Sequence, residues 1–350
     1  YTADPQENIV YIAAHDNQTL FDIGQYHHPV DTTMADRVRA QVVGNAIVAL
    51  AQGVPFFHAG QDMLRSKSLD RDSYNSGDWF NRLDFTYQSN NFGVGLPVAE
   101  KNESNWPIQG PLLANPDLVP EASDIVRNAE VTREWLEIRT SSPLFRLQTA
   151  AEVQERVSFL NTGASQIPGL VVMQVSDPAG GTTDLDLVRD GVVALFNPTD
   201  EPVEFAAPQL AGTGLELHPV LAQSVDPLVR TSTFDDVSGT FVIPARTASV
   251  FVDPGPDLAP PTATAAFETL HAGRRTGTFR VEASCVDDRP GVEMAASLNG
   301  VEVDDGDVVR LITTRHRRDH RETSWGHVFR APSFELSVRC TDAAGNVSTA

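Results

Sequence analysis

Cysteine is scarce in this sequence, and long hydrophobic runs are absent. Cys285 and Cys340 are the only cysteines among 350 residues, which is too few for a zinc ligand set. No apolar stretch approaches the roughly 20 residues that cross a bilayer as a helix. We therefore expect neither a zinc site nor a membrane-spanning segment.

Basic residues are also in short supply. The chain has 26 Lys and Arg against 47 Asp and Glu, which gives a formal net charge of -21. A phosphate backbone or an anionic membrane surface would be repelled overall by such a chain. We expect a neutral partner, with no nucleic acid and no membrane among its ligands.

The two cysteines lie in strand-like segments near the C-terminal end of the chain. A disulfide between Cys285 and Cys340 would stabilise the fold by roughly 4 kcal/mol in the chain-entropy description. It would also indicate an oxidising compartment, extracellular or periplasmic. Two unpaired buried thiols are the alternative interpretation.

The first part of the chain has the order strand, helix, strand. Residues 8–14 and 54–57 are short apolar runs, each followed by polar or glycine-containing turns, and they predict two buried strands. Between them, Thr33 and Asp36 have the spacing of a capping box. The predicted helix that they open has one apolar stripe, which comprises Val38, Val42, Ala46, Ile47 and Leu50. This order predicts a parallel crossover unit.

A long excursion rich in Asn, Asp, Ser, Gly and Pro follows, from Leu64 to about Pro120. Loops of this length in compact domains are usually functional. Pro120 then opens a predicted helix to about Arg139. Its apolar face comprises Ile125, Ala129 and Leu136.

After residue 150 the pattern changes to short strands separated by turn signals, which predicts an antiparallel β domain. The predicted strands are 156–161, 170–176, 191–196, 202–206, 214–220 and 239–252. A Pro-rich linker at 253–261 precedes a second strand-rich region, 262–350, which we interpret as a small Ig-like β-sandwich. The fold class expected from the sequence is therefore α/β followed by all-β.

Two stretches have the residue types of a binding site. Asp16 and His15 follow the first predicted strand directly, where parallel βα folds place their functional groups. A neutral imidazole can donate to a sugar hydroxyl, and a carboxylate accepts from one. Residues 65–85 mix carboxylates, amides, Arg and aromatic rings, which suits a pyranose. The alternatives are that His15 and Asp16 merely cap the next turn, and that the second stretch is a solvated surface loop.

Three long segments, in the same order, resemble a known family. They read NIVYIAAHDNQTLFDIG, GVPFFHAGQDMLRSKSLDRDSYNSGDWFNRLDF and EWLEIRTSSPLFRL. Together they are similar to pullulanase, a debranching-enzyme family of the α-amylase superfamily, glycoside hydrolase family 13. The resemblance covers residues 1 to about 253 and leaves 262–350 outside.

The resemblance implies a fold and a set of site residues. Residues 8–14 and 54–57 would be the seventh and eighth strands of a (β/α)8 TIM barrel. Residues 1–149 would then be the C-terminal part of the catalytic barrel, and 150–255 the C-terminal β-sandwich domain. Asp16 matches the invariant carboxylate that binds sugar hydroxyls at the cleavage site and supports the transition state, and His15 lies beside it. By the same resemblance the substrate cleft around the branch is lined by Asn17, Arg71, Asp72 and Tyr74.

The implied reaction is hydrolysis of α-1,6-glucosidic links in pullulan, amylopectin or limit dextrins, with retention. Retaining enzymes need a nucleophile and a general acid about 5–5.5 Å apart. In this family both lie on earlier barrel strands, so we expect them upstream of Tyr1 in a longer parent protein and expect this chain to be inactive alone. No organic cofactor is expected, and a calcium ion in the parent has no ligands assignable here.

Two other classes of function stay open from the sequence. One is a related superfamily hydrolase, such as an isoamylase or an α-1,4-acting amylase, because a carboxylate after a strand does not fix linkage specificity. The other is a non-catalytic glycan-binding or surface protein in which the β modules carry the function. An Asp and a Glu at the ends of two further barrel strands would exclude the second class.

Overall fold

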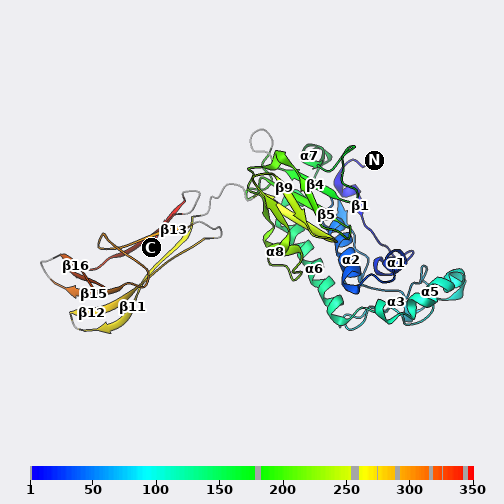
Figure 1. The fold of residues 1–350 in the computed structure, drawn as a ribbon, viewed down its shortest axis with the longest axis horizontal. Coiled ribbons are helices and arrows are strands. Elements are labelled where there is room, and N and C mark those ends of the chain that lie inside the picture. The colour runs from blue at the N-terminus through cyan, green and yellow to red at the C-terminus, as the bar shows by residue number, and fades with distance from the viewer. Residues whose placement is uncertain are drawn as a thin grey trace. The chain divides into compact units, whose positions relative to one another are not determined.

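The chain forms two compact units, Tyr1–Gly255 and Pro256–Ala350 (Figure 1). The computed structural model describes residues 2–177, 183–253, 260–273, 275–287, 292–314, 318–324, 326–341 and 346–350. Strands predominate, and the helices of the described residues lie in the first unit. The predicted linker at 253–261 lies mostly outside the described residues.

The first unit begins with the predicted parallel crossover, which is confirmed. Strand β1 (Ile9–Val10) pairs in parallel with β2 (Val54–Pro55). Helices α1 (Leu20–His27) and α2 (Met34–Leu50) lie between them in the chain.

The prediction that these strands are buried is wrong. Both are only two residues long, and Tyr11, which follows β1, is 58% exposed. Ile9 and Phe56 are exposed as well, and the rings of Tyr11 and Phe56 meet edge to face. The reason is that the sheet has two strands in the described part of the chain, so each strand has a single neighbour.

Helix α2 begins as its sequence predicts. The Thr33 hydroxyl accepts from the Asp36 backbone N–H at 3.2 Å and donates to the Asp36 carboxylate at 2.8 Å. The predicted apolar stripe is buried at four positions, but Ile47 is exposed. Ile47 instead lines an apolar hollow, together with Val153 and Val171.

The excursion after β2 contains short helices rather than continuous loop. These are η2 (Gln61–Met63), α3 (Asp78–Asn81), α4 (Ala99–Asn102), η3 (Glu103–Asn105), α5 (Trp106–Leu113) and η4 (Pro116–Leu118). Helix α6 (Ala122–Ser141) follows, capped reciprocally by Glu121 and Asp124. Its predicted face is wrong at Leu136, which is 42% exposed, because Trp135 and Ile138 point into the core instead.

The β part of the first unit has two sheets. The larger has the order β3-β4-β5-β10-β7 and the smaller β6-β9-β8, and every pairing in both is antiparallel. The strands are β3 (Val157–Phe159), β4 (Val171–Ser176), β5 (Gly191–Asn197), β6 (Val203–Ala206), β7 (Glu216–Leu217), β8 (Thr233–Asp235), β9 (Thr240–Ile243) and β10 (Thr247–Asp253). The predicted strand 239–252 is therefore two strands, separated at Arg246, whose φ is 45°.

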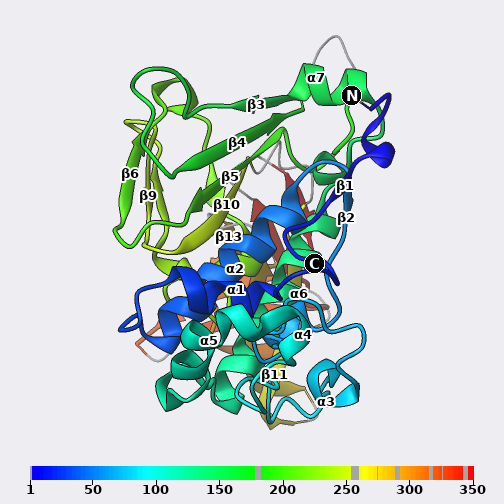
Figure 2. The ribbon, with the colours of Figure 1, turned by 90° about the vertical axis from the view of Figure 1, so that its right-hand side faces the viewer.

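Five short helical elements after the excursion were not predicted. They are η5 (Pro143–Arg146), α7 (Ala150–Arg156), η6 (Pro208–Leu210), α8 (Pro219–Ala222) and, after them, the turn η7 (Val229–Thr231). Figure 2 shows β3, β4, β5 and β10 side by side, next to α2.

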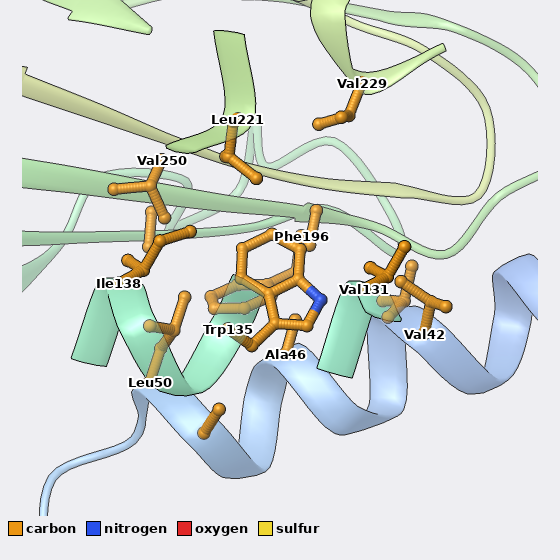
Figure 3. Packing of buried hydrophobic residues seen from close by; sticks show 14 of the residues in the cluster. Val42, Ala46, Leu50, Val131, Trp135, Ile138, Phe196, Leu221, Val229 and Val250 are labelled. Carbon is orange, nitrogen blue, oxygen red and sulfur yellow. The ribbon is translucent and has the colours of Figure 1, made fainter. Parts of the chain in front are cut away.

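The larger sheet is covered on both faces. On β5, Val192, Ala194 and Phe196 face the helices, whereas Val193 and Leu195 face the smaller sheet. On the helix side, α2 and α6 supply the other half of the core, with Trp135 set between Ala46, Leu50 and the sheet (Figure 3). This burial on two sides places helices and sheets of the first unit in three layers.

The second unit consists of two sheets that share one apolar core. The five-stranded sheet has the order β11-β12-β15-β17-β16, and the four-stranded sheet β14-β13-β18-β19. Their strands are β11 (Thr262–Ala272), β12 (Thr276–Val286), β13 (Glu293–Leu298), β14 (Val301–Val303), β15 (Val308–Thr313), β16 (Asp319–Thr323), β17 (Gly326–Ala331), β18 (Leu336–Thr341) and β19 (Val347–Thr349). A disulfide joins Cys285 on β12 to Cys340 on β18 and so links the two sheets.

Trp135 is the side chain whose loss should cost the first unit most. It is 2% exposed, and truncation of a buried Trp to Ala costs about 3–5 kcal/mol. We therefore expect Trp135→Ala to lower the free energy of unfolding by about that amount in urea denaturation followed by circular dichroism.

Two further variants control this prediction. Trp135→Phe should cost much less, because the indole nitrogen has no hydrogen-bond partner in the described structure and the ring contacts are largely kept. Leu136→Ala removes the exposed neighbour and should change stability by less than about 1 kcal/mol. Equal losses in the Trp135→Ala and Leu136→Ala variants would contradict the packing.

Candidate functional site

The predicted site residues His15, Asp16 and Asn17 lie together in the turn after β1. The side chains of His15 and Asp16 are 88% and 77% exposed, and His15 Nε2 lies 3.6 Å from Asp16 Oδ1. Asn17 adopts the left-handed backbone conformation, with φ of 59°. Residues 11–18 and Ile23 line a hollow of about 620 Å³ at this end of the strand.

Thr19, rather than His15 or Asp16, caps the helix that follows this turn. Thr19 is the N-cap of α1, and its hydroxyl accepts from the Asp22 backbone N–H at 3.1 Å. Among the described residues, His15 is the one ion-pair partner of the Asp16 carboxylate. The Asp16 oxygens are therefore available to a ligand.

A buried polar network lies behind this turn. Asp22 accepts from the Ser66 hydroxyl at 2.5 Å and from the Lys67 backbone N–H at 2.7 Å. The Lys67 ammonium donates to the carbonyl oxygen of His15 at 3.0 Å. All three network side chains are fully buried. The network ties the turn after β1 to α1 and to the start of the excursion.

Burial governs the charges in this network. Desolvation raises the pKa of Asp22 to about 6, against the lowering effect of its hydrogen bonds from Ser66 and Lys67. Desolvation also lowers the pKa of Lys67, while the nearby Asp22 and Asp70 carboxylates oppose that change. An ammonium buried to this degree is retained only with such partners.

His58 follows β2, three residues after the end of that strand. Its Nε2 lies 3.2 Å from Arg65 Nη1. Desolvation, followed by the charges of Arg65, Lys67 and His15, lowers the pKa of His58 to about 4. His58 is therefore neutral at physiological pH, and its imidazole can accept a hydrogen bond from the guanidinium.

The structure does not bring the other predicted cleft residues into the hollow beside Asp16. Tyr74 and Arg71 are exposed, and Asp72 Oδ2 lies 3.9 Å from Lys101 Nζ. None of the three lines that hollow. Their loop is ordered by the buried Asp70, which accepts from the amide of Asn102 and the hydroxyl of Ser76.

This chain is similar to proteins of one known family. Residues 87–254 match the family described as alpha-1,6-glucosidases, pullulanase-type, C-terminal. The chain is 49% identical over 256 residues to Pullulanase 1, chloroplastic, of Arabidopsis thaliana, covering 72% of this chain and 26% of the relative. It is 37% identical over 252 residues to Pullulanase of Klebsiella pneumoniae, covering 71% and 23%. The chain carries a pullulanase-type C-terminal domain.

The structural comparison agrees with this assignment. The crystal structure of apo pullulanase from Klebsiella pneumoniae matches 73% of this chain and 27% of that chain, with a TM-score of 0.69 at 37% identity. The chain thus spans about a quarter of the length of the pullulanases it matches. The resemblance to pullulanase that the three sequence segments indicate is confirmed.

Sequence reasoning did not identify the network residues of this pullulanase-type chain. Asp22 and Lys67 are charged residue types that are usually exposed, and nothing in their local pattern marks them as buried. His58 could have been selected as a candidate from the sequence, because it directly follows a short apolar segment, as His15 and Asp16 do. The described residues contain no group of three or more His, Cys, Asp or Glu side chains placed to hold a metal ion, and no helix that could cross a membrane.

Lys67→Met should destabilise the first unit strongly. The substitution removes the buried ammonium, so the His15 carbonyl loses its donor and Asp22 loses a cation that favours its charged form. Loss of a hydrogen bond made by a charged group costs about 1.5–3 kcal/mol, to be measured by urea unfolding. The control is Lys101→Met, a half-exposed lysine 3.9 Å from Asp72, which should cost less than about 1 kcal/mol. Similar losses of stability in both variants would show that the buried Lys67 network contributes no more to stability than an exposed lysine does.

The raised pKa of Asp22 predicts a pH dependence of stability. Between pH 3.8 and about 6 the folded chain keeps a proton that the unfolded chain releases, so this contribution is complete below pH 3.8 and is lost as pH rises through 6. The size is about 3 kcal/mol, from a shift of about two pKa units. Unfolding of the native chain and of Asp22→Asn should be measured from about pH 3.5 to 8.

The difference between these two proteins isolates Asp22. Because Asn does not titrate, the native chain should lose stability relative to Asp22→Asn between about pH 4 and 6, and the difference should be constant above pH 7. A difference that does not vary with pH would contradict the assigned shift. A difference that changes in the opposite direction would mean that the hydrogen bonds from Ser66 and Lys67 outweigh burial.

Proposed function

We propose that this chain is part of a debranching enzyme that hydrolyses α-1,6-glucosidic links in pullulan, amylopectin or limit dextrins. The observation that carries the proposal is Asp16, an exposed carboxylate in the turn that follows the parallel strand β1, with His15 beside it. The relatives that support it are named pullulanases. In this proposal α-glucan is the partner, and neither nucleic acid nor membrane is bound.

In the proposed mechanism Asp16 acts on the sugar at the cleavage site. Its carboxylate accepts hydroxyl hydrogen bonds, and its charge stabilises the oxocarbenium-like transition state of glycoside hydrolysis. His15 donates to a neighbouring hydroxyl. The retaining pair of nucleophile and general acid is supplied by the parent protein outside this chain. Asn17, Arg71, Asp72 and Tyr74 contact the glucan around the branch when the cleft is complete.

The proposal includes an architecture, which the parallel pairing of β1 and β2 supports. Strands β1 and β2 are the last two strands of a (β/α)8 barrel in residues 1–149. The exposed side chains Tyr11 and Phe56, each directly after one of these strands, pack against further barrel elements of the parent. Residues 150–255 are the C-terminal β-sandwich domain, and 262–350 an Ig-like accessory module.

The compartment and cofactors complete the proposal. The disulfide between Cys285 and Cys340 favours an extracellular or periplasmic location, although the Arabidopsis relative is named chloroplastic. The reaction class needs no organic cofactor, and the parent's calcium requirement has no assigned ligand in this chain.

Replacement of Asp16 by Asn in the full-length parent should remove most of the activity. Loss of one preorganised group that stabilises the transition state costs about 100- to 1000-fold in kcat. The measurement is reducing-sugar release from pullulan. The matched control is Asp117→Asn, which removes another exposed carboxylate far along the chain and should leave the rate unchanged.

The 350-residue chain alone should release no reducing sugar in the same assay. Activity of this chain would mean that its own carboxylates form a complete site, and the barrel proposal would have to be abandoned. An Asp16→Asn parent with undiminished kcat would remove Asp16 from the mechanism.

A further inference from the structure

Trp79 is a surface aromatic residue whose ring is held in one orientation. The residue is 65% exposed, yet its indole N–H donates to the carbonyl oxygen of Val94 at 2.9 Å. The side-chain amide of Asn91 also donates to the Trp79 carbonyl at 3.0 Å. Because the indole N–H lies in the plane of the ring, this bond fixes the ring at its edge and leaves an apolar face open to a ligand.

The turn that carries Trp79 is held just as firmly. Helix α3 ends at Asn81, whose amide donates to the carbonyl oxygens of Ser73 at 2.8 Å and Gly77 at 3.0 Å. The Ser73 hydroxyl donates back to Asn81 Oδ1 at 2.8 Å. A platform built in this way loses little conformational entropy when a ligand binds to it.

Polar side chains border the ring. Asp78, Trp79, Asn81 and Arg82 line a hollow of about 360 Å³. Asp78 and Arg82 are exposed, and their side chains make no hydrogen bond or ion pair within the described ranges. The hollow thus offers one apolar ring face, one acceptor group and one donor group.

We propose that Trp79 is the stacking platform of a glucan-binding subsite, with Asp78 and Arg82 serving the sugar hydroxyls. The C–H face of a pyranose stacks on an indole, the carboxylate accepts from hydroxyls and the guanidinium donates to them. The choice of α-glucan as the ligand rests on the proposed function. A neutral ligand also suits a chain with a net charge of -21.

This subsite is separate from the turn that holds Asp16. The hollow at Trp79 and the hollow beside Asp16 share no lining residue. The subsite therefore binds a glucose unit other than the one at the cleavage position, and its loss should weaken glucan binding without removing the chemistry at Asp16.

The test compares glucan affinity among variants of the full-length protein, all carrying Asp16→Asn so that the probe is not hydrolysed. Affinity electrophoresis in amylopectin gels and calorimetry with maltoheptaose give the Kd. Trp79→Ala should raise the Kd roughly three- to tenfold, the range expected for loss of one stacked aromatic. Trp79→Phe should weaken binding less than Trp79→Ala, because it keeps an aromatic ring but loses the hydrogen bond to the Val94 carbonyl.

The matched control is Phe85→Ala, which removes an equally exposed aromatic side chain outside the hollow and should leave the Kd unchanged. An unchanged Kd in Trp79→Ala overturns the subsite, and so does an equal weakening in Phe85→Ala. Should Trp79→Ala fail to fold, the double variant Asp78→Asn with Arg82→Gln tests the same hollow, and an unchanged Kd there overturns it.

The outcome is independent of the debranching assay. If the unmutated parent releases no reducing sugar from pullulan, the proposed function fails, whereas the comparison of Trp79→Ala with Phe85→Ala still decides whether this ring binds glucan. If the parent is active and the Kd of Trp79→Ala is unchanged, the proposed subsite is contradicted and the proposed function is not.

Discussion

The contact of α2 and α6 with the larger β-sheet is the interaction on which the rest of the first unit depends. The parallel pair β1 and β2 contributes only four strand residues and has an exposed face, so it cannot supply a core of its own. Helix α2 connects this pair to the large apolar cluster, because its buried side chains pack both on α6 and on strands β5 and β10. The position of the turn that carries Asp16 therefore depends on the packing of α2 against the larger sheet.

Polar contacts fix the register of that packing. The guanidinium of Arg139 on α6 donates to the carbonyl oxygens of Ala49, Ala51 and Gly53, which satisfies the C-terminal end of α2. Nearby, Asn45 links Thr132 on α6 to the side chain of Gln61. Apolar packing alone would allow the helices to slide, whereas these directional bonds set where the strand β2 ends and the excursion begins.

The sequence predicted the elements better than their exposure. The apolar periodicity of α2 and α6 identified both helices, but Ile47 and Leu136 lie at the margins of the apolar stripe and are exposed. Trp135 is buried in the core, whereas its neighbour Leu136 is exposed. Spacing alone does not show which of these two adjacent apolar residues points inward. Tyr11 and Phe56 were expected in a buried sheet, since apolar strands are usually covered on both sides.

Some residues of the candidate site could be predicted from the sequence, and others could not. The position of Asp16 after an apolar strand was a local signal and could be read directly. The function of Lys67 could not, because it depends on a side chain that reaches the carbonyl of His15, 52 positions away in the chain. Residues 71–74 carried the expected residue types, but their relation to Asp16 depends on tertiary structure that no spacing rule encodes.

Two carboxylates near one another in the sequence, Asp16 and Asp22, have opposite environments. Asp22 is buried and holds backbone in place, whereas Asp16 is exposed to solvent. In water, a unit charge 4 Å away from Asp16 gains only about 1 kcal/mol, and in a less polar cleft the same pair gains several times more. For Asp16 to stabilise a developing positive charge, other protein surfaces and the glucan itself must exclude water from around it. The solvent exposure of Asp16 in this chain is thus the physical reason why the role proposed for its carboxylate requires a site from which water is excluded.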